Sequence, residues 1–138
     1  MAAAVALENL RILEEEKIVQ RVHDNTGPYL TEAWARLADH PLVGEAVNRG
    51  LMASIALTPD KARRAPFAAP VGTAGLIARE RCFANNLVMR HVGDRMIISP
   101  PLIISRDDID EVIARAARAL DETLEILHRR NLMTAAAA

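Results

Sequence analysis

The clearest periodic pattern lies near the carboxyl end of the chain. From Ile109 onward apolar residues recur every three or four positions, which predicts one long amphipathic helix. Ser105, followed three residues later by Asp108, is typical of a capping box and marks the start of this helix. Basic residues 128–130 suit the negative end of its dipole. The predicted apolar stripe comprises Ile109, Val112, Ile113, Ala116, Leu120, Leu124 and Leu127.

A second amphipathic pattern covers residues 2–16, which are rich in Ala, Leu and Glu. Its stripe comprises Ala3, Ala6, Leu7, Leu10 and Leu13. No Ser, Thr, Asp or Asn precedes the helix as an N-cap, and its apolar face begins almost at the first residue. This start is compatible with a boundary inside a longer segment and equally with a frayed native N-terminus.

Residues 18–39 predict another helix, with Ile18, Val22, Leu30, Ala33 and Leu37 facing inward. We expect a kink or break at Gly27 and Pro28, because proline has no N–H to donate to the preceding turn. His40 and Pro41 end the segment.

In the central part of the chain, residues 51–57 follow a period of two, and short apolar runs lie at 87–92 and 95–99. These patterns favour strands at residues 43–47, 51–57, 87–92 and 95–99. Gly93 and Asp94 join the last two strands as a hairpin turn, and residues 72–86 predict a helix between the two strand pairs. The predicted fold is therefore α+β: a small, mainly antiparallel sheet with flanking helices. We expect one domain over residues 1–134 and a disordered tail at 135–138.

Composition narrows the function classes. The chain has 138 residues, a net charge of −1 and 51% hydrophobic residues, so nothing indicates a nucleic-acid partner or a polybasic membrane anchor. No apolar run reaches the length of a membrane helix or has the leader of a secretory signal. The single cysteine, Cys82, excludes an internal disulfide and favours a cytoplasmic location.

Several kinds of chemistry find little support. The four histidines show no metal-ligand spacing with one another, so we predict no metal site. Cys82 is better interpreted as a buried, inert thiol than as a nucleophile activated by Arg79 and Arg81. Gly72 and Gly75 before a predicted helix are only a weak match to a phosphate-binding loop.

Arg90 stands out because it interrupts an otherwise apolar strand. Its pattern alone favours an exposed arginine on the solvent face. The functional alternative is a clamp for a ligand carboxylate, since the planar guanidinium can donate to both carboxylate oxygens.

Two runs carry a resemblance to a known family. Residues 82–94 (CFANNLVMRHVGD) and 96–102 (MIISPPL) resemble the C-terminal segment of class III pyridoxal-phosphate-dependent aminotransferases. Residues 49–52 (RGLM) are similar to the RGxGLM motif of that family but lack its second glycine, and residues 40–45 (HPLVGE) are similar to the segment before it. The opening helix is similar to the one that leads into the small domain. The ω-transaminases acting on putrescine or β-alanine with pyruvate are the most similar group.

The resemblance implies a fold-type-I enzyme in which this chain is the C-terminal small domain. Arg90 matches the arginine of the family's LxMRxxGD motif, which binds the substrate carboxylate; His91 replaces a small residue there. The family holds pyridoxal phosphate through a large-domain lysine as a Schiff base. The chain's only lysines, Lys17 and Lys61, match no such position. We therefore expect no catalytic residue and no bound cofactor in this chain alone.

The expected function is that of a transaminase domain moving an amino group from an amine or ω-amino acid to pyruvate or a similar keto acid. Its partners would be these small molecules and other copies of the chain, in a homo-oligomer. The alternatives are a stand-alone carboxylate-binding module and a structural or dimerisation module, neither of them catalytic.

Overall fold

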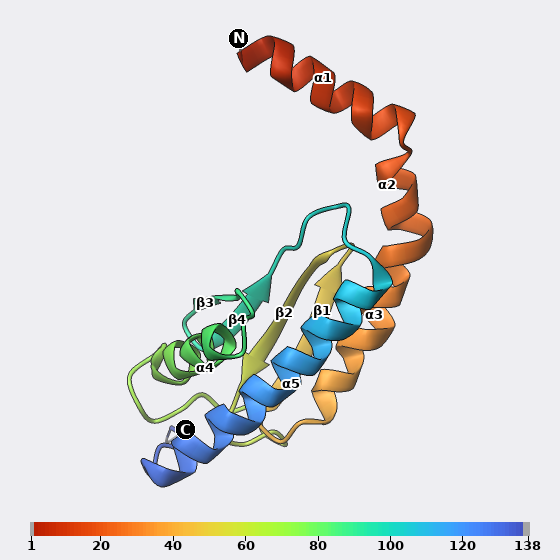
Figure 1. The fold of residues 1–138 in the computed structure, drawn as a ribbon. Coiled ribbons are helices and arrows are strands. Elements are labelled where there is room, and N and C mark those ends of the chain that lie inside the picture. Colours follow the sequence, from red (N-terminus) through yellow and green to blue (C-terminus); the bar gives the residue numbers. More distant parts are fainter. Residues whose placement is uncertain (1, 137–138) are drawn as a thin grey trace.

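The computed structural model describes residues 2–136, and it confirms the predicted α+β class (Figure 1). The helices are α1 (Ala2–Glu15), α2 (Ile18–Arg21), α3 (Gly27–Ala35), α4 (Thr73–Ala84) and α5 (Arg106–Arg129), with a π-helical segment at Val22–Thr26 and a 3-10 turn at Arg36–Asp39. The strands are β1 (Val43–Arg49), β2 (Met52–Leu57), β3 (Arg90–Val92) and β4 (Arg95–Ile98).

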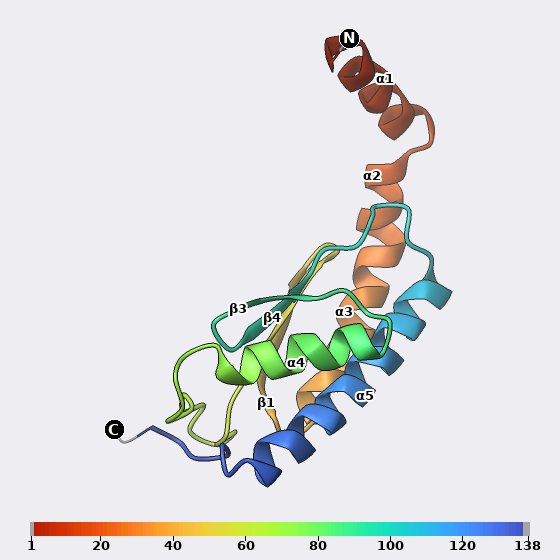
Figure 2. The ribbon, with the colours of Figure 1, turned by 60° about the vertical axis from the view of Figure 1, so that its left-hand side comes forward.

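The four strands form one sheet in the order β1-β2-β4-β3, and every neighbouring pair is antiparallel. Helices α3, α5 and α4 lie side by side over one face of this sheet (Figures 1 and 2). Alternate strand residues, among them Ala53, Ile55, Met96 and Ile98, are buried against that helical layer. The residues between them point to the other side, which no helix covers within residues 2–136. We call this side the open face.

The long helix α5 follows its prediction closely. Asp108 N–H donates to Ser105 Oγ at 3.1 Å, and the Asp108 carboxylate accepts from the Ser105 N–H at the same distance, which completes the capping box. Ile109, Leu120 and Leu127 of the predicted stripe are buried in the core. A capped start and a buried apolar face together explain why this helix forms and where it packs.

The predicted break near Gly27 is a π-helical segment. The Gly27 N–H donates to the Val22 carbonyl, five residues back instead of four, directly before Pro28. A Cβ at Gly27 would lie 2.5 Å from that carbonyl oxygen, so the widened turn requires glycine here. Ile18 and Leu30 are buried on either side of the segment, as predicted.

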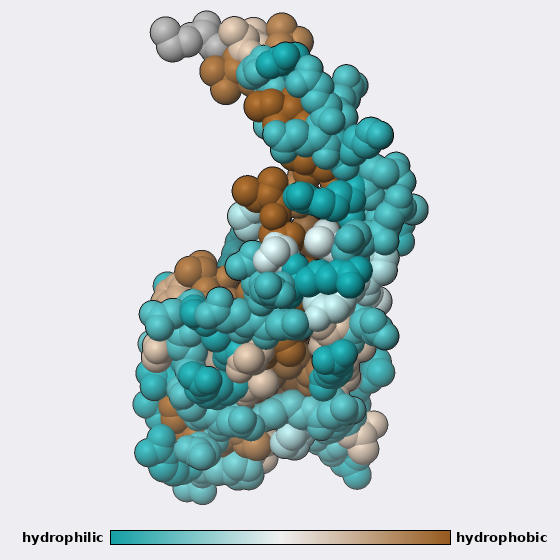
Figure 3. Space-filling model, turned by 45° about the vertical axis from the view of Figure 1, so that its right-hand side comes forward, coloured by the Kyte–Doolittle hydropathy of each residue, from teal (hydrophilic) through white to brown (hydrophobic). Residues whose placement is uncertain are grey.

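Helix α1 extends away from the rest of the molecule and contacts mainly α2 (Figures 1 and 2). It forms as predicted, but its apolar stripe faces outward: Leu7 is 68% exposed and Leu10 58%. Brown apolar surface is accordingly visible along α1 in Figure 3. Within residues 2–136, α1 adds no side chain to the hydrophobic core.

Two boundaries differ from the sequence-based expectation. Strand β3 begins at Arg90, because residues 87–89 form an irregular segment in which Leu87 and Met89 are buried without strand pairing. Ala135, in the expected tail, bridges to Phe67, and the Ala136 N–H donates to the Pro66 carbonyl at 2.9 Å. The ordered chain thus extends at least two residues beyond 134, and residues 137–138 lie outside the described part. No helix of the described residues is long and apolar enough to cross a membrane.

Candidate functional site

The candidate site is built on the β3–β4 hairpin, which is fixed to the start of α4. Asp94 in the turn accepts the N–H of Gly75 at 3.0 Å and that of Gly72 at 3.2 Å, so its carboxylate caps α4 from a distant part of the sequence. A Cβ at Gly75 would lie 2.1 Å from the carbonyl oxygen of Gly93. Only glycine permits this approach, so the hairpin turn packs directly against the start of α4.

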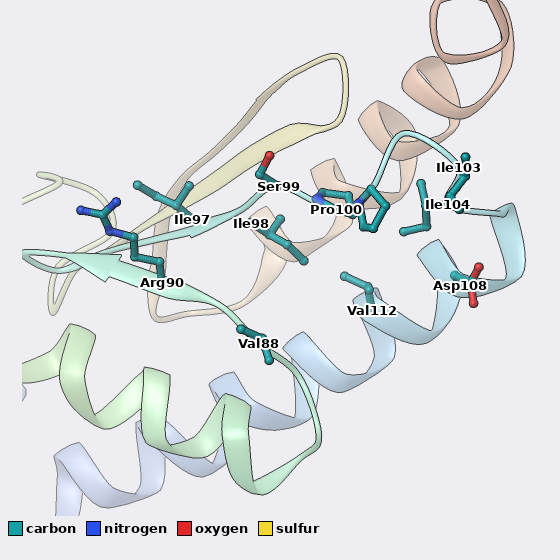
Figure 4. A pocket seen from close by; sticks show the side chains of 11 residues that line it. Val88, Arg90, Ile97, Ile98, Ser99, Pro100, Ile103, Ile104, Asp108 and Val112 are labelled. Atoms are coloured by element: carbon teal, nitrogen blue, oxygen red, sulfur yellow. The ribbon is translucent and has the colours of Figure 1, made fainter. Parts of the chain in front are cut away.

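Arg90 lies on this hairpin, paired across the sheet with Ile97. Its side chain is exposed on the open face and borders a cavity of about 680 Å³. Figure 4 shows the guanidinium at one end of a row of mostly apolar side chains from β4, the following loop and α5. The other wall residues include Val88, Ile97, Ile98, Ser99, Pro100, Ile104 and Val112.

A second arginine on the same hairpin, Arg95, is already neutralised. Its Nη2 lies 2.6 Å from Oε2 of Glu45, and its Nη1 donates to Oγ of Ser54 at 3.0 Å. The hydrogen bond and charge of Arg95, with a contribution from Arg64, lower the pKa of the Glu45 carboxyl group. Glu45 is thereby committed to Arg95, which leaves Arg90 as the unpaired cation of the hairpin.

The carboxylate in the cavity wall, Asp108, already accepts hydrogen bonds from Ser105. Asp108 lies at the opposite end of the row from Arg90 (Figure 4) and accepts from both the N–H and the hydroxyl of Ser105. These hydrogen bonds lower the pKa of Asp108. Among residues 2–136 no carboxylate forms an ion pair with Arg90. The geometry therefore leaves a guanidinium at the rim of an apolar cavity, available to an external anion.

The other sequence candidates fall outside this site. Cys82 is buried, which raises the pKa of its thiol to about 11 and keeps it protonated near neutral pH, as the inert interpretation predicted. The N–H groups at Gly72 and Gly75 are occupied by Asp94, so the weak phosphate-loop match is a capping arrangement instead. In the described part of the chain no three His, Cys, Asp or Glu side chains gather as metal ligands would.

Sequence reasoning missed two contributors to the site: the Glu45–Arg95 ion pair and the capping of α4 by Asp94. The Glu45–Arg95 pair joins residues 50 positions apart in the sequence. Strand alternation predicts only that Arg95 and Ile97 lie on the same face of β4, and it does not predict the partner of Arg95. The same alternation turns His91 toward α4, where a Cβ at Gly75 would lie 3.2 Å from its Nδ1. His91 thus lies on the opposite side of β3 from the Arg90 guanidinium.

Neither lysine belongs to the site. Lys61 Nζ donates to the carbonyl of Ala38 and, at 3.5 Å, to that of His40. Lys17 is exposed at the junction of α1 and α2, in the left-handed backbone region. Neither side chain lines the cavity beside Arg90.

Comparison with known proteins gives consistent results. The profile of the family Aminotransferase class-III matches residues 1–120. The chain is 53% identical over 123 residues to putrescine–pyruvate aminotransferase of Pseudomonas aeruginosa, covering 89% of this chain and 26% of that protein. It is 33% identical to γ-aminobutyrate transaminase 3 of Solanum lycopersicum, covering 89% of this chain and 23% of the relative.

Comparison with solved structures also identifies transaminases as similar proteins. A thermostable ω-transaminase variant from Pseudomonas jessenii superposes with a TM-score of 0.85 at 38% identity, covering 91% of this chain and 28% of the other. The chain thus spans about a quarter of the length of the curated relatives that it matches.

Proposed function

Because the chain belongs to the class III aminotransferase family, we propose that it is the C-terminal part of a transaminase that moves an amino group from an amine or ω-amino acid to pyruvate or a similar keto acid. The name of the Pseudomonas aeruginosa relative supports putrescine as a donor and pyruvate as the acceptor. Residues 1–134 would form the small domain of that enzyme.

The unpaired Arg90 carries this proposal. A keto-acid or amino-acid substrate must present a carboxylate, and the guanidinium can bind both of its oxygens at once. The hairpin holds the backbone of Arg90 through Asp94 and α4, while the long side chain remains free to turn toward or away from a ligand. In a partly dry site such a pair contributes about 1.5–3 kcal/mol, or roughly ten- to a hundredfold in affinity.

The family depends on pyridoxal phosphate, which supplies the electron sink for amino transfer once bound. The lysines of this chain do not fit the cofactor. Lys61 donates to two backbone carbonyls, and Lys17 lies at the exposed end of α1. We propose that the anchoring lysine belongs to another part of the enzyme, and that this chain alone holds no cofactor as a Schiff base and is inactive.

This last point has a direct test. The chain is mixed with pyridoxal phosphate, reduced with borohydride and weighed by mass spectrometry. The proposal expects no stoichiometric adduct; labelling of Lys17 or Lys61 would contradict it.

The remaining expectations concern partners and location. We propose that the enzyme assembles as a homo-oligomer and works in the cytoplasm on small-molecule substrates. The exposed apolar stripe of α1 supports contact with a further protein surface, and the reduced state of a buried Cys82 is compatible with a reducing compartment.

The function is best tested in a chimera. Residues 1–134 replace the matching segment of the Pseudomonas aeruginosa putrescine–pyruvate aminotransferase, which supplies the rest of the enzyme. We expect the chimera to transaminate pyruvate, and Arg90→Ala to lower kcat/KM for pyruvate and β-alanine by roughly ten- to a hundredfold. Arg90→Lys should recover only part of this loss, since an ammonium group lacks the planar fork.

Two controls make the result specific. The half-reaction with a simple monoamine should be nearly unchanged in Arg90→Ala, because that substrate offers no carboxylate. Arg36→Ala, at an exposed arginine of the helical layer, should leave all substrates unaffected. An equal loss for substrates with and without a carboxylate would show that Arg90 is structural. A chimera that folds but does not turn over pyruvate would contradict the proposed function itself.

A further inference from the structure

A second, separate hollow lies between α4 and the end of α5, which pack side by side (Figure 2). Its volume is about 330 Å³, and it shares no wall residue with the cavity beside Arg90. Three arginines and one acid line it together with two isoleucines: Ile77, Glu80, Arg81, Ile126, Arg129 and Arg130. The wall therefore carries a net charge of two positive units at neutral pH.

Arg81 is the unusual member of this group. Its Nε is buried and has no hydrogen-bond partner among the described residues. A buried N–H of a charged group that lacks an acceptor is costly, so an acceptor is expected at this point. Glu122, on the facing helix, accepts from the Asn85 side chain at 3.1 Å and forms no hydrogen bond with the Arg81 Nε.

The helix dipole explains only part of the arrangement. Positive side chains at the carboxyl end of α5 are favoured there, which accounts for the sign of Arg129 and Arg130. The carbonyls at this end already accept backbone N–H groups: Ile126 from Arg130, and Leu127 from Leu132. None of the three arginines forms an ion pair within residues 2–136. The unsatisfied Nε of Arg81 therefore remains to be explained.

We propose that this hollow binds a phosphate group, either as inorganic phosphate or as a phosphate monoester. Guanidinium groups present paired N–H donors that match the oxygens of phosphate. A phosphate monoester carries about −1.5 to −2 charge near pH 7, which balances the two positive units of the wall. A carboxylate would balance only one. Arg81 would donate from the base of the site, and Arg129 and Arg130 from its rim.

Calorimetric titration of the full chain with inorganic phosphate tests the proposal, at low salt because the rim is exposed to screening. Saturable binding is expected, and Arg81→Gln should weaken it by about tenfold or more, since a charge-assisted hydrogen bond is lost. Arg118→Gln, at an exposed arginine of α5 outside the hollow, should bind like the wild type. Glu80→Gln should bind more tightly, because it removes the opposing charge.

Separate arms identify the source of the phosphate. Tighter binding of glycerol phosphate than of inorganic phosphate indicates a monoester ligand, and the reverse indicates the free ion; both support the site. Acetate at equal ionic strength should bind much more weakly. Acetate binding as tight as phosphate binding, absence of phosphate binding, or an Arg81→Gln variant that binds like the wild type would overturn the proposal. If Arg81→Gln does not fold, the Arg129→Gln/Arg130→Gln variant applies the same criterion to exposed positions.

Discussion

Helices α1 and α5 are both amphipathic, yet they have opposite fates in the structure. The Asp108 carboxylate and Ser105 cap the first turn of α5, and its apolar stripe is buried against α3, α4 and the sheet. The sequence offers no Ser, Thr, Asp or Asn ahead of α1, and the apolar stripe of this helix is exposed apart from a half-buried Leu13. Periodicity thus predicts a helix and its apolar face, whereas the burial of that face depends on a second surface that periodicity does not reveal.

The largest expected effect compares one leucine from each helix. Leu127 of α5 is 0% exposed and Leu10 of α1 is 58% exposed. Leu127→Ala should lower the free energy of unfolding by about 2–5 kcal/mol, because it leaves a cavity in the core. Leu10→Ala should change it by less than about 0.5 kcal/mol. Urea unfolding measures both, and equal losses would show that α1 packs on the body of the molecule in solution.

The second prediction concerns what covers α1. Leu7 and Leu10, with the exposed Ala3 and Ala6, form an apolar stripe along α1, so the isolated chain should self-associate as its concentration rises. Leu7→Glu/Leu10→Glu should weaken this association at least about tenfold, which corresponds to about 1.4 kcal/mol. Glutamate keeps the helix propensity high, so the change acts on the surface and not on the helix.

Sedimentation velocity over a concentration series measures this association. Val88→Glu is the matched control, because Val88 is 78% exposed but lies beside the hairpin. A wild-type chain that stays monomeric at high concentration would contradict the prediction, and an equal effect of Val88→Glu would assign the association to another surface.

The comparison also shows how far sequence reasoning reaches. Local signals located well-defined elements: the capping box at Ser105 and the turn at Gly93 are both where they were predicted. The π-helical segment at Val22–Thr26 was expected only as a break, because an apolar pattern does not distinguish a bond to the fifth residue from one to the fourth. The apolar residues 87–89 were assigned to a strand because a buried irregular segment has the same composition as a strand.

The candidate site was likewise predictable only where it depends on a local sequence signal. Arg90 was found because it interrupts a local apolar run. The absence of an ion pair at Arg90 could not be predicted from the sequence. It depends on the ion pair of Glu45 with Arg95 and on the capping of α5 by Asp108. The long-range role of Asp94 was also missed, because a Gly-Asp pair signals a hairpin turn and says nothing about the start of a distant helix.

The third prediction concerns the capping box of α5. Ser105→Ala removes the hydroxyl that accepts the Asp108 N–H at 3.1 Å. It should lower the free energy of unfolding by about 1 kcal/mol, within a range of about 0.5–2 kcal/mol. Ser99→Ala, at an exposed serine of the preceding loop, should have no measurable effect in the same urea experiment. If the two variants lower the free energy of unfolding equally, the capping box does not stabilise α5.

The smallest effect concerns a contact that joins α5 to the loop before β1. His40 Nε2 lies 3.3 Å from Oδ1 of Asp121, and its Nδ1 accepts the N–H of Leu42 at 3.1 Å. Burial lowers the pKa of His40 from its ordinary value, and Asp121 opposes that shift only in part. The bond from Leu42 requires the neutral ring, with the proton on Nε2 and a lone pair on Nδ1 that accepts the Leu42 N–H. Protonation of Nδ1 would break the bond from Leu42.

The sign of the pH effect follows from this depressed pKa. As pH falls through about 6.5, the unfolded chain binds a proton at His40 before the folded chain does. The contribution of His40 is thus fully present above that pH and is lost progressively down to the lower folded pKa. His40→Gln should flatten this part of the stability curve between about pH 7.5 and about pH 5.5. A curve of unchanged slope in His40→Gln, measured by urea unfolding at each pH, would mean that His40 does not contribute to the pH dependence of the contact with α5.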